Sequence, residues 1–316
     1  MTRASPRPTR RAGAQPPAAL IARGLGESRL AFGLAGLGGA WGPVDPGLAR
    51  ETLQLAFSLG IHVFDVAPAY GTAEALLGEA LRTWRGPRPI VSTKVGRLPG
   101  RDALEMRYEH GSESLRDSLR RSLDQLGLPA VDLLFLHEPE EVPHGERARV
   151  ADTLQGLRGE GLVHRLGLGG GDGPAWDGFI ETGVFDVVML FRRLDACIFD
   201  GLADEVPRLR RAGLATYGAS PLHMGLLGSR HHEFLRERPE WVWTRPAARA
   251  VRLRELAEAR GIPLSMLAHR FAFSLEELDR VVIGARSPAE LQDAWAAFTA
   301  GPLPAELFDA VCAAHN

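Results

Sequence analysis

The segment Ile90-Val91-Ser92-Thr93-Lys94 predicts a buried strand that ends in a charge. Lys94 is the one lysine among the 37 basic side chains of this chain, and all the others are arginines. Lysine is a compact charge whose pKa responds to burial, whereas arginine is a planar fork with a permanent charge. A position that keeps lysine in so arginine-rich a chain is therefore a candidate for chemistry.

Two neighbouring strand-like segments end in polar residues in the same way. Ile61-His62-Val63-Phe64 leads into Asp65, and Leu133-Leu134-Phe135-Leu136 leads into His137. In an α/β barrel the carboxyl ends of the strands meet at one rim, where catalytic residues gather. We therefore expect Asp65, Lys94 and His137 to converge, with Tyr70 above them in the loop that follows Asp65.

The whole chain alternates strand-like and helix-like segments, which is typical of a parallel α/β fold. With 316 residues it has room for one (β/α)8 TIM barrel, a fold of about 250 residues. A doubly wound sheet is the rival fold, but no Gly-x-Gly-x-x-Gly motif follows an early strand. We predict a single barrel domain over residues 23–316. The eight predicted strands are Leu30–Leu34, Ile61–Asp65, Pro89–Lys94, Val131–His137, Val163–Leu168, Phe185–Leu190, Ala215–Tyr217 and Val281–Ile283.

Composition excludes several classes of protein. The net charge of −2 gives no electrostatic case for a nucleic-acid or membrane partner. Residues 1–22 are rich in Pro and Arg without an apolar run, so we expect a disordered tail rather than a secretion signal. The two cysteines lack metal or redox spacing, and His231-His232 lacks the helical spacing of metal ligands, so a solvated loop is expected there. A cytoplasmic enzyme without a metal fits these observations.

The predicted rim carries the parts of a proton-transfer device. A tyrosine phenol, with a pKa of about 10, transfers protons poorly near neutrality. A nearby ammonium such as Lys94 lowers that pKa, and a carboxylate such as Asp65 keeps the ammonium charged. The imidazole of His137 can donate a hydrogen bond to a carbonyl oxygen. Together these groups can polarise and protonate a carbonyl.

These segments resemble the catalytic motifs of the aldo-keto reductases. The resemblance lies in Asp65-Val66-Ala67-Pro68-Ala69-Tyr70-Gly71, Ser92-Thr93-Lys94 and Leu136-His137, and it runs from about Leu30 to Phe298. It implies a TIM barrel that binds NADP or NAD across the rim, with Tyr70 as general acid/base, Lys94 and Asp65 tuning it, and His137 orienting the carbonyl. The aldose and pyridoxal dehydrogenase branch looks most similar.

The same resemblance implies the residues that hold the cofactor. Ser220 and Leu222 match the loop that holds the pyrophosphate, and Gly284 to Ser287 match the adenosine-phosphate loop. Arg286 and Ser287 precede an expected helix, so a positive charge and a helix N-terminus would act together on an anion.

The sequence departs from the family pattern at the expected nicotinamide platform. Gly169 and Gly170 stand where relatives often have Ser-Asn, and Met189 stands where they often have Gln. Arg192 or Arg193 replaces the stacking aromatic. Glu290 falls where many relatives place a base for the 2′-phosphate, which disfavours NADPH, while Arg286 favours it. The choice between NAD and NADP stays open.

The sequence thus predicts an oxidoreductase that moves a hydride between NAD(P) and a small carbonyl or hydroxyl compound, such as an aldehyde, ketone or aldose. Two alternatives remain. The altered platform could belong to a cofactor-binding or sensing barrel with weak turnover. Lys94 could also form a Schiff base, as in an aldolase. The identity of the substrate, the direction of reaction and the oligomeric state do not follow from the sequence.

Overall fold

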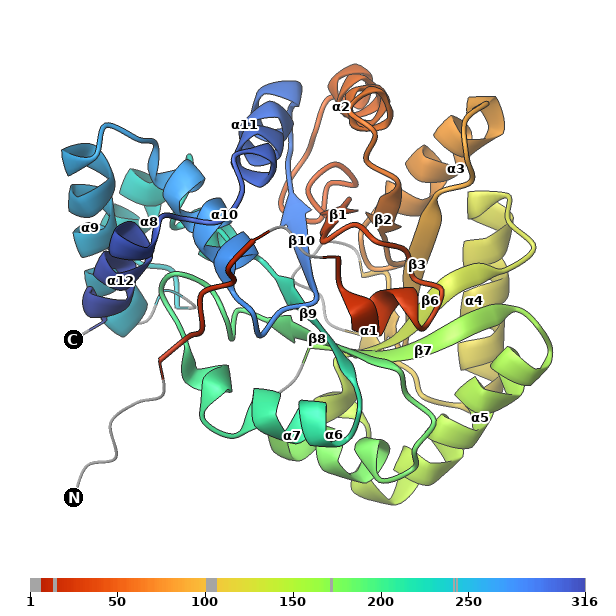
Figure 1. Ribbon diagram of the computed structural model, residues 1–316. Helices are drawn as coiled ribbons and strands as arrows, with labels where there is room; N and C mark the ends of the chain where they lie inside the picture. Colours follow the sequence, from red (N-terminus) through yellow and green to blue (C-terminus); the bar gives the residue numbers. More distant parts are fainter. Residues whose placement is uncertain are drawn as a thin grey trace.

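The computed structural model describes residues 7–13, 16–100, 107–170, 173–240, 242 and 244–315. Within these ranges, eight parallel strands close a barrel in the order β1-β10-β9-β8-β7-β6-β3-β2 (Figure 1). This arrangement confirms the predicted (β/α)8 barrel. The strands are β1 (Leu30–Gly33), β2 (Val63–Asp65), β3 (Ile90–Val95), β6 (Val131–His137), β7 (Val163–Gly169), β8 (Val187–Phe191), β9 (Ala215–Ala219) and β10 (Arg280–Gly284).

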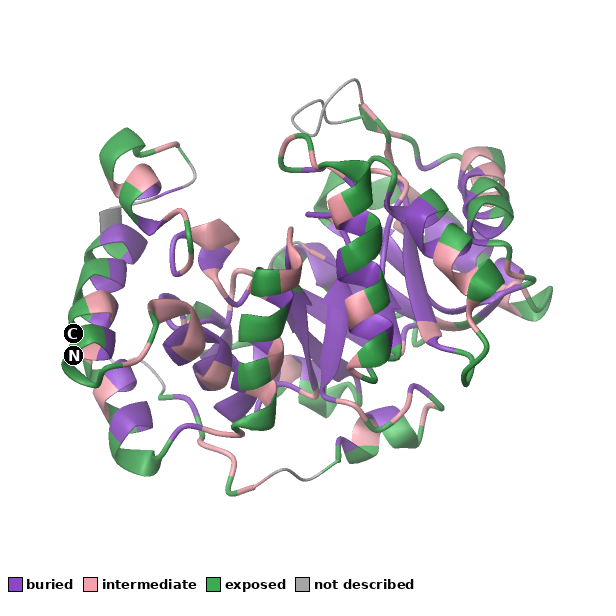
Figure 2. Ribbon diagram, turned by 90° about the horizontal axis from the view of Figure 1, so that it is seen from above, coloured by how far each residue is buried: buried purple, intermediate pink, exposed green. Residues whose placement is uncertain are grey.

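Helices surround the barrel with their outer faces exposed, and the strands inside are almost entirely buried (Figure 2). The amphipathic pattern of Ser112–Leu126 predicted α4 with its observed bounds, and Gly127 ends it in the left-handed conformation. The helices are α2 (Pro46–Ser58), α3 (Ala73–Thr83), α4 (Ser112–Leu126), α5 (Arg147–Gly159), α6 (Gly173–Ile180), α7 (Glu205–Arg211), α8 (His231–Glu237), α9 (Thr244–Ala259), α10 (Leu264–Ser274), α11 (Pro288–Thr299) and α12 (Ala305–Ala313).

The apolar core has two layers. One layer lies between the strands and the surrounding helices, and the other fills the inside of the barrel. The inner layer includes Phe135, Met189 and Tyr217. A filled interior is the usual condition of this fold, so the barrel is a packed core and not a pore. Chemistry is therefore confined to its two ends.

The amino-terminal segment differs from the predicted disordered tail. A short helix, α1 (Ala18–Ile21), lies over one end of the barrel (Figure 1), and Leu20 is fully buried in the inner core layer. The backbone N–H of Arg11 also donates to the carbonyl of Ser274, over 2.8 Å. Composition missed this because two or three apolar residues suffice to cover a barrel end. Residues 1–6 and 14–15 of the segment lie outside the described residues.

The segment at His231 also differs from expectation. Instead of a solvated loop it begins helix α8, where His231 is buried and its Nδ1 lies 2.8 Å from the carbonyl oxygen of Leu226. Helices α8, α10 and α12 were not among the predicted helices. Among the helices described, none is long and apolar enough to cross a lipid bilayer.

Candidate active site

The carboxyl ends of β2, β3 and β6 bring together the residues predicted from their strand ends. Asp65 pairs in register with Ser92 on β3, and the Ser92 hydroxyl donates to Asp65 Oδ1 over 2.7 Å. Lys94 Nζ lies 2.6 Å from Asp65 Oδ2. His137 ends β6, and its ring centroid lies 5.7 Å from that of Tyr70, edge to face. The four predicted catalytic side chains therefore share one rim.

Lys94 is held as a charged group in a dry site. Its side chain is 2% exposed and that of Asp65 is 5% exposed. The ammonium also donates to the carbonyl of Val66, over 3.0 Å. Burial alone would lower the pKa of Lys94, but the charges of Asp65 and Tyr70 and their hydrogen bonds reverse this, and the pKa is raised above its ordinary value. An unpaired buried charge would be costly, so the two partners hold each other in place.

Tyr70 and His137 are both shifted toward their neutral forms. Burial raises the pKa of the Tyr70 phenol, although the charge and the hydrogen bond of Lys94 act in the opposite direction. The effect of Lys94 has the predicted sign, but burial outweighs it. Burial, followed by the charges of Lys94 and Arg97, puts the pKa of His137 well below its ordinary value. A neutral imidazole carries one N–H that can donate to a carbonyl oxygen.

Two glycines fix the loop that carries Tyr70. A Cβ at Gly38 would overlap the carbonyl oxygen of Tyr70, and a Cβ at Gly71 would overlap the carbonyl oxygen of Gly38. Gly71 also has a φ of +60°, which glycine adopts at little cost. The Thr72 N–H donates to the carbonyl of Gly38 over 3.0 Å. This close approach of two loops sets the height of the phenol above the rim.

The expected nicotinamide platform lies at the ends of β7 and β8. Gly169 pairs with His137 on one side and with Met189 on the other, so all three positions are adjacent. Met189 is buried, at 5% exposure, in the inner core layer. Gly170 is half-buried, and its N–H donates to the carbonyl of Met189 over 3.1 Å. The small residues leave backbone, not side chains, beside His137.

Arg192 and Arg193 are neighbours in the chain, but their side chains contact different residues. Arg193 binds Glu205, with 2.5 Å between Nη2 and Oε1. Arg192 has a φ of +54° and places its guanidinium 5.2 Å from the ring centroid of Phe191. Phe191, the last residue of β8, is 36% exposed. Sequence reasoning overlooked Phe191, although its place at the end of an apolar strand was a signal.

The predicted pyrophosphate loop follows β9 and has an unusual backbone. Ser220, His223 and Met224 all have positive φ, at 64°, 48° and 59°. Such backbone is uncommon outside glycine and is found most often at functional sites. The buried imidazole of His223 lies 2.8 Å from the carboxylate of Asp195, which holds this loop against the one after β8. Leu222 is half-buried in the same turn.

The predicted adenosine-phosphate loop lies between β10 and α11. Gly284 is exposed, with open space where a Cβ would be. Ser287 caps α11 by accepting from the N–H of Glu290. The Glu290 carboxylate accepts from the N–H of Arg286 over 2.9 Å. The Arg286 side chain donates to the carbonyl of Pro43, and its buried Nε has no hydrogen-bond partner within the described part of the chain.

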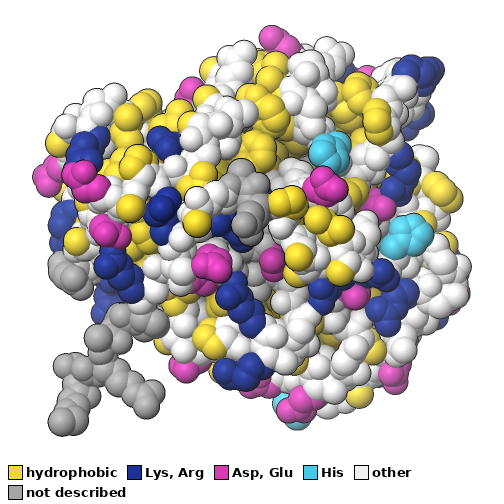
Figure 3. Space-filling model, in the orientation of Figure 1, with side chains coloured by type: hydrophobic (Ala, Val, Ile, Leu, Met, Phe, Trp, Pro, Cys, Tyr) yellow, Lys and Arg dark blue, Asp and Glu magenta, His cyan; other side chains and the backbone are white. Residues whose placement is uncertain are grey.

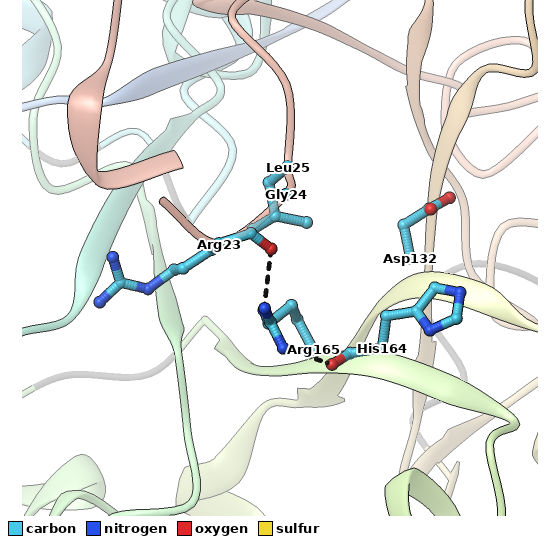
Figure 4. A pocket seen from close by; sticks show the side chains of 6 residues that line it. All are labelled: Arg23, Gly24, Leu25, Asp132, His164 and Arg165. Atoms are coloured by element: carbon cyan, nitrogen blue, oxygen red, sulfur yellow. Dashed lines mark hydrogen bonds between the residues drawn. The ribbon is translucent and has the colours of Figure 1, made fainter. Parts of the chain in front are cut away.

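The opposite end of the barrel has a different character. An open pocket of about 290 Å³ lies there, between the α1–β1 connection and the first residues of β6 and β7 (Figure 4). Two of its charged groups are already engaged, since Arg165 donates to the carbonyl of Arg23 and Asp132 binds Arg88. On the face seen in Figure 3, acidic and basic side chains are interspersed. This end therefore resembles a structural surface more than a charged binding site.

Metal chemistry has no support from the side chains. Among the described residues, no group of three or more His, Cys, Asp or Glu side chains could hold a metal ion. Cys197 and Cys312 are both buried free thiols.

Comparison with known proteins agrees with this geometry. The model of the aldo/keto reductase family matches residues 29–316. The chain is 30% identical to an L-galactose dehydrogenase of Arabidopsis thaliana over 293 residues, which covers 87% of this chain and 86% of the relative. It is 28% identical to a pyridoxal 4-dehydrogenase of Microbacterium luteolum, covering 87% and 90%, and 27% identical to a D-threo-aldose 1-dehydrogenase of a Pseudomonas species, covering 92% and 94%.

Solved structures share the fold. A glycerol dehydrogenase from Gluconobacter oxydans superposes with a TM-score of 0.74 at 24% identity, with 91% of each chain covered. An aldo-keto reductase from Bacillus halodurans superposes with a TM-score of 0.76 at 21% identity, with 92% of each chain covered.

Proposed function

Because this chain belongs to the aldo/keto reductase family, an enzyme family, we propose that it moves a hydride between a nicotinamide cofactor and the carbonyl carbon of an aldehyde or aldose. The observation that carries the proposal is the dry Lys94–Asp65 pair, 2.6 Å apart, beside the Tyr70 ring, whose centroid lies 4.8 Å from Lys94 Nζ. Relatives that are named as sugar and aldehyde enzymes support this substrate class.

Each of the four side chains has a distinct role in the proposal. The cofactor, when bound, supplies or accepts the hydride. In the reducing direction, the Tyr70 O–H gives its proton to the carbonyl oxygen as that oxygen gains negative charge. The Lys94 ammonium stabilises the phenolate that remains, and Asp65 keeps the ammonium in place. The neutral imidazole of His137 donates a hydrogen bond to the carbonyl oxygen. Oxidation reverses these transfers.

The residues around the rim fit a dinucleotide. Phe191 offers an exposed aromatic face at the end of β8, and Ser220 follows β9 with a strained backbone. Further along the rim lie the open surface over Gly284 and Arg286, whose Nε has no hydrogen-bond partner among the residues described, close to the N-terminus of α11. We therefore propose that Gly169, Gly170 and Met189 border the nicotinamide, Ser220 and Leu222 the pyrophosphate, and Gly284 to Ser287 the adenosine.

The charge beside the proposed adenosine site favours NADH over NADPH. The carboxylate of Glu290 accepts from the backbone of Arg286 at the start of α11, where an additional phosphate would meet its charge. Arg286 already donates to Pro43. Glu290→Gln keeps an acceptor for this N–H but removes the charge, so it should raise the affinity for NADPH relative to NADH. Titration of tryptophan fluorescence with both cofactors checks this.

The Schiff-base alternative has less support, since an aldolase lysine must be an unprotonated amine and the pKa of Lys94 is raised.

Purified protein should oxidise NADH in the presence of a small aldehyde, with a loss of absorbance at 340 nm, and Tyr70→Phe should lower the rate about 100-fold or more. Saturable binding of NADH without turnover would favour a cofactor-sensing barrel instead.

A further inference from the structure

A polar cluster formed by Arg97, Tyr108 and Glu138 lies on the catalytic rim and takes no part in the chemistry proposed above. Arg97 Nη1 lies 2.9 Å from Glu138 Oε1, and the Tyr108 hydroxyl donates to Glu138 Oε2. Glu138 directly follows His137, and Arg97 comes three residues after Lys94. The charge of Arg97 acts on both Tyr70 and His137. The cluster therefore borders the position of the reacting carbonyl.

The backbone holds the cluster at the rim. Arg97 begins β4 (Arg97–Leu98), which pairs with β5 (Arg107–Tyr108) in a small antiparallel ladder beyond the end of β3. Gly96, with a φ of +103°, makes the turn between β3 and β4. Glu138 has a left-handed backbone with a φ of 56°, and its N–H donates to the carbonyl of Gly169 over 2.7 Å. Left-handed backbone at a residue other than glycine is uncommon, and it is found most often at functional sites.

The cluster is accessible, and its described members carry charges of both signs. The side chains of Arg97 and Glu138 are 12% and 23% exposed, so a ligand on the rim can reach them. One cation, one anion and a phenol offer both donors and acceptors within a few ångströms. Burial, together with the hydrogen bond and the charge of Glu138, raises the pKa of Tyr108, which keeps its hydroxyl protonated. A free anion would be repelled by Glu138, and a free cation by Arg97.

We infer that Arg97, Tyr108 and Glu138 bind the hydroxyl groups next to the carbonyl of a polyhydroxy aldehyde or sugar, an inference that rests on the proposed function. A substrate hydroxyl can donate to the Glu138 carboxylate while it accepts from Arg97, and a second hydroxyl can donate to the Tyr108 oxygen, whose own O–H is donated to Glu138. Neighbouring hydroxyls can do so together without adding charge. An unsubstituted alkyl chain would instead remove water from these groups and return no hydrogen bond.

Glyceraldehyde and propanal test this inference, because both are three-carbon aldehydes and only the first has hydroxyls. With NADH, the wild-type kcat/KM for glyceraldehyde should exceed that for propanal by about tenfold or more. Glu138→Gln and Tyr108→Phe should each reduce that ratio about tenfold. The change should appear mainly in KM for glyceraldehyde, because the hydroxyls bind but do not react. Glu160→Gln, which breaks an Arg–Glu pair between α4 and α5 on the outer surface, is the matched control and should keep the wild-type ratio.

The outcomes separate this inference from the proposed function. Reduction of both aldehydes with a ratio that neither variant changes would overturn the inference and leave the function intact. An equal loss with both aldehydes, together with weaker NADH binding, would also overturn it, since that is the signature of a cluster that only anchors β4 and β5. Failure of the wild type to reduce either aldehyde would overturn the proposed function and the inference with it. If Glu138→Gln does not fold, Tyr108→Phe alone decides.

Discussion

At the scale of single residues, the lone lysine is the best-defined part of the site. Its Nζ donates to Asp65 and to the carbonyl of Val66 in a position that is almost free of solvent. An arginine there would keep the charge but spread it over a larger plane that cannot occupy the same space. This explains why an arginine would not serve at this position.

Replacement of Lys94 by arginine should therefore lower kcat/KM for aldehyde reduction by about 100-fold or more, because the guanidinium cannot stabilise the Tyr70 phenolate from the same point. Steady-state NADH oxidation measures this. Arg50→Lys is a suitable control, since Arg50 forms an exposed pair with Glu79 on the outer surface. Full activity of the Lys94→Arg protein would refute the role given to the lysine.

The identities of the residues predicted that the catalytic side chains would meet, but they did not predict which of them are protonated. The strand ends foretold that Asp65, Lys94 and His137 would meet, because neighbouring parallel strands end at one rim. The net shift of the Tyr70 pKa depends on how many atoms cover the phenol, and those atoms come from loops far apart in the chain. The contacts of Glu138 with Arg97 and Tyr108 could not be predicted either, because the three residues come from separate segments of the rim.

At the scale of elements, a contact between two loops sets the position of Tyr70, the proposed general acid. Gly38, after β1, touches the carbonyl of Tyr70, after β2. A methyl group at Gly38 must push the two loops apart. Displacements of about 1 Å can cost an enzyme about 100-fold in rate.

Gly38→Ala should accordingly reduce kcat at least about tenfold. The matched control is Gly159→Ala, because Gly159 ends α5 with open space around its Cα, so the added methyl group should be tolerated. Measurement of kcat and of the circular dichroism spectra of the two variants would show whether Gly38→Ala lowers kcat while the protein stays folded, as a displaced Tyr70 requires. Equal kcat values for both variants would remove the argument for the loop contact.

Helix α10 carries a buried histidine that predicts acid sensitivity. His269 is 2% exposed, and neither ring nitrogen has a hydrogen-bond partner among the described residues. Burial lowers its pKa from 6.5 to about 4. The unfolded chain therefore takes up the proton first as the pH falls, so stability is lost progressively from about pH 6.5 down to about pH 4.

This one residue should cost about 2 kcal/mol in the free energy of unfolding between pH 7.5 and pH 5. His269→Leu, which removes the titrating group from an apolar site, should reduce the pH dependence by that amount. Urea unfolding at both pH values measures the difference. An unchanged pH dependence in His269→Leu would show that other groups control acid unfolding.

The elements themselves were predicted unevenly. The strands and the amphipathic helix Ser112–Leu126 follow directly from their periodicity. Helix α10 was not predicted, because most of its residues are buried and leave little of the polar face by which a surface helix is recognised. Residues 18–21 were assigned to a tail because a four-residue helix gains its stability from the barrel it covers rather than from its own sequence.

At the scale of the whole molecule, the barrel separates stability from chemistry. The carboxyl ends of the strands carry the candidate catalytic residues, and the amino ends are covered by α1. This division is the general rule for such barrels. Substitutions of the residues that α1 buries against the barrel should therefore alter stability without altering turnover.

Leu20→Ala should lower the free energy of unfolding by about 2–5 kcal/mol, because it leaves a cavity at the closed end of the barrel. Its kcat/KM at temperatures where it is folded should stay within about twofold of the wild-type value, since the site lies at the other end. The adjacent Ile21, 45% exposed, provides the control, and Ile21→Ala should cost much less stability. A large loss of kcat/KM in folded Leu20→Ala would contradict the separation of the two ends.

The central claim is that a hydride passes from the nicotinamide cofactor to a carbonyl carbon at this rim. The most direct measurement is to incubate the wild-type protein with glyceraldehyde and NADH deuterated at C4 of the nicotinamide, and to follow the product by NMR. The account predicts glycerol with deuterium at the former carbonyl carbon, and label transfer at least about 100-fold slower with Tyr70→Phe. Saturable binding of NADH without the formation of deuterated glycerol would contradict the account.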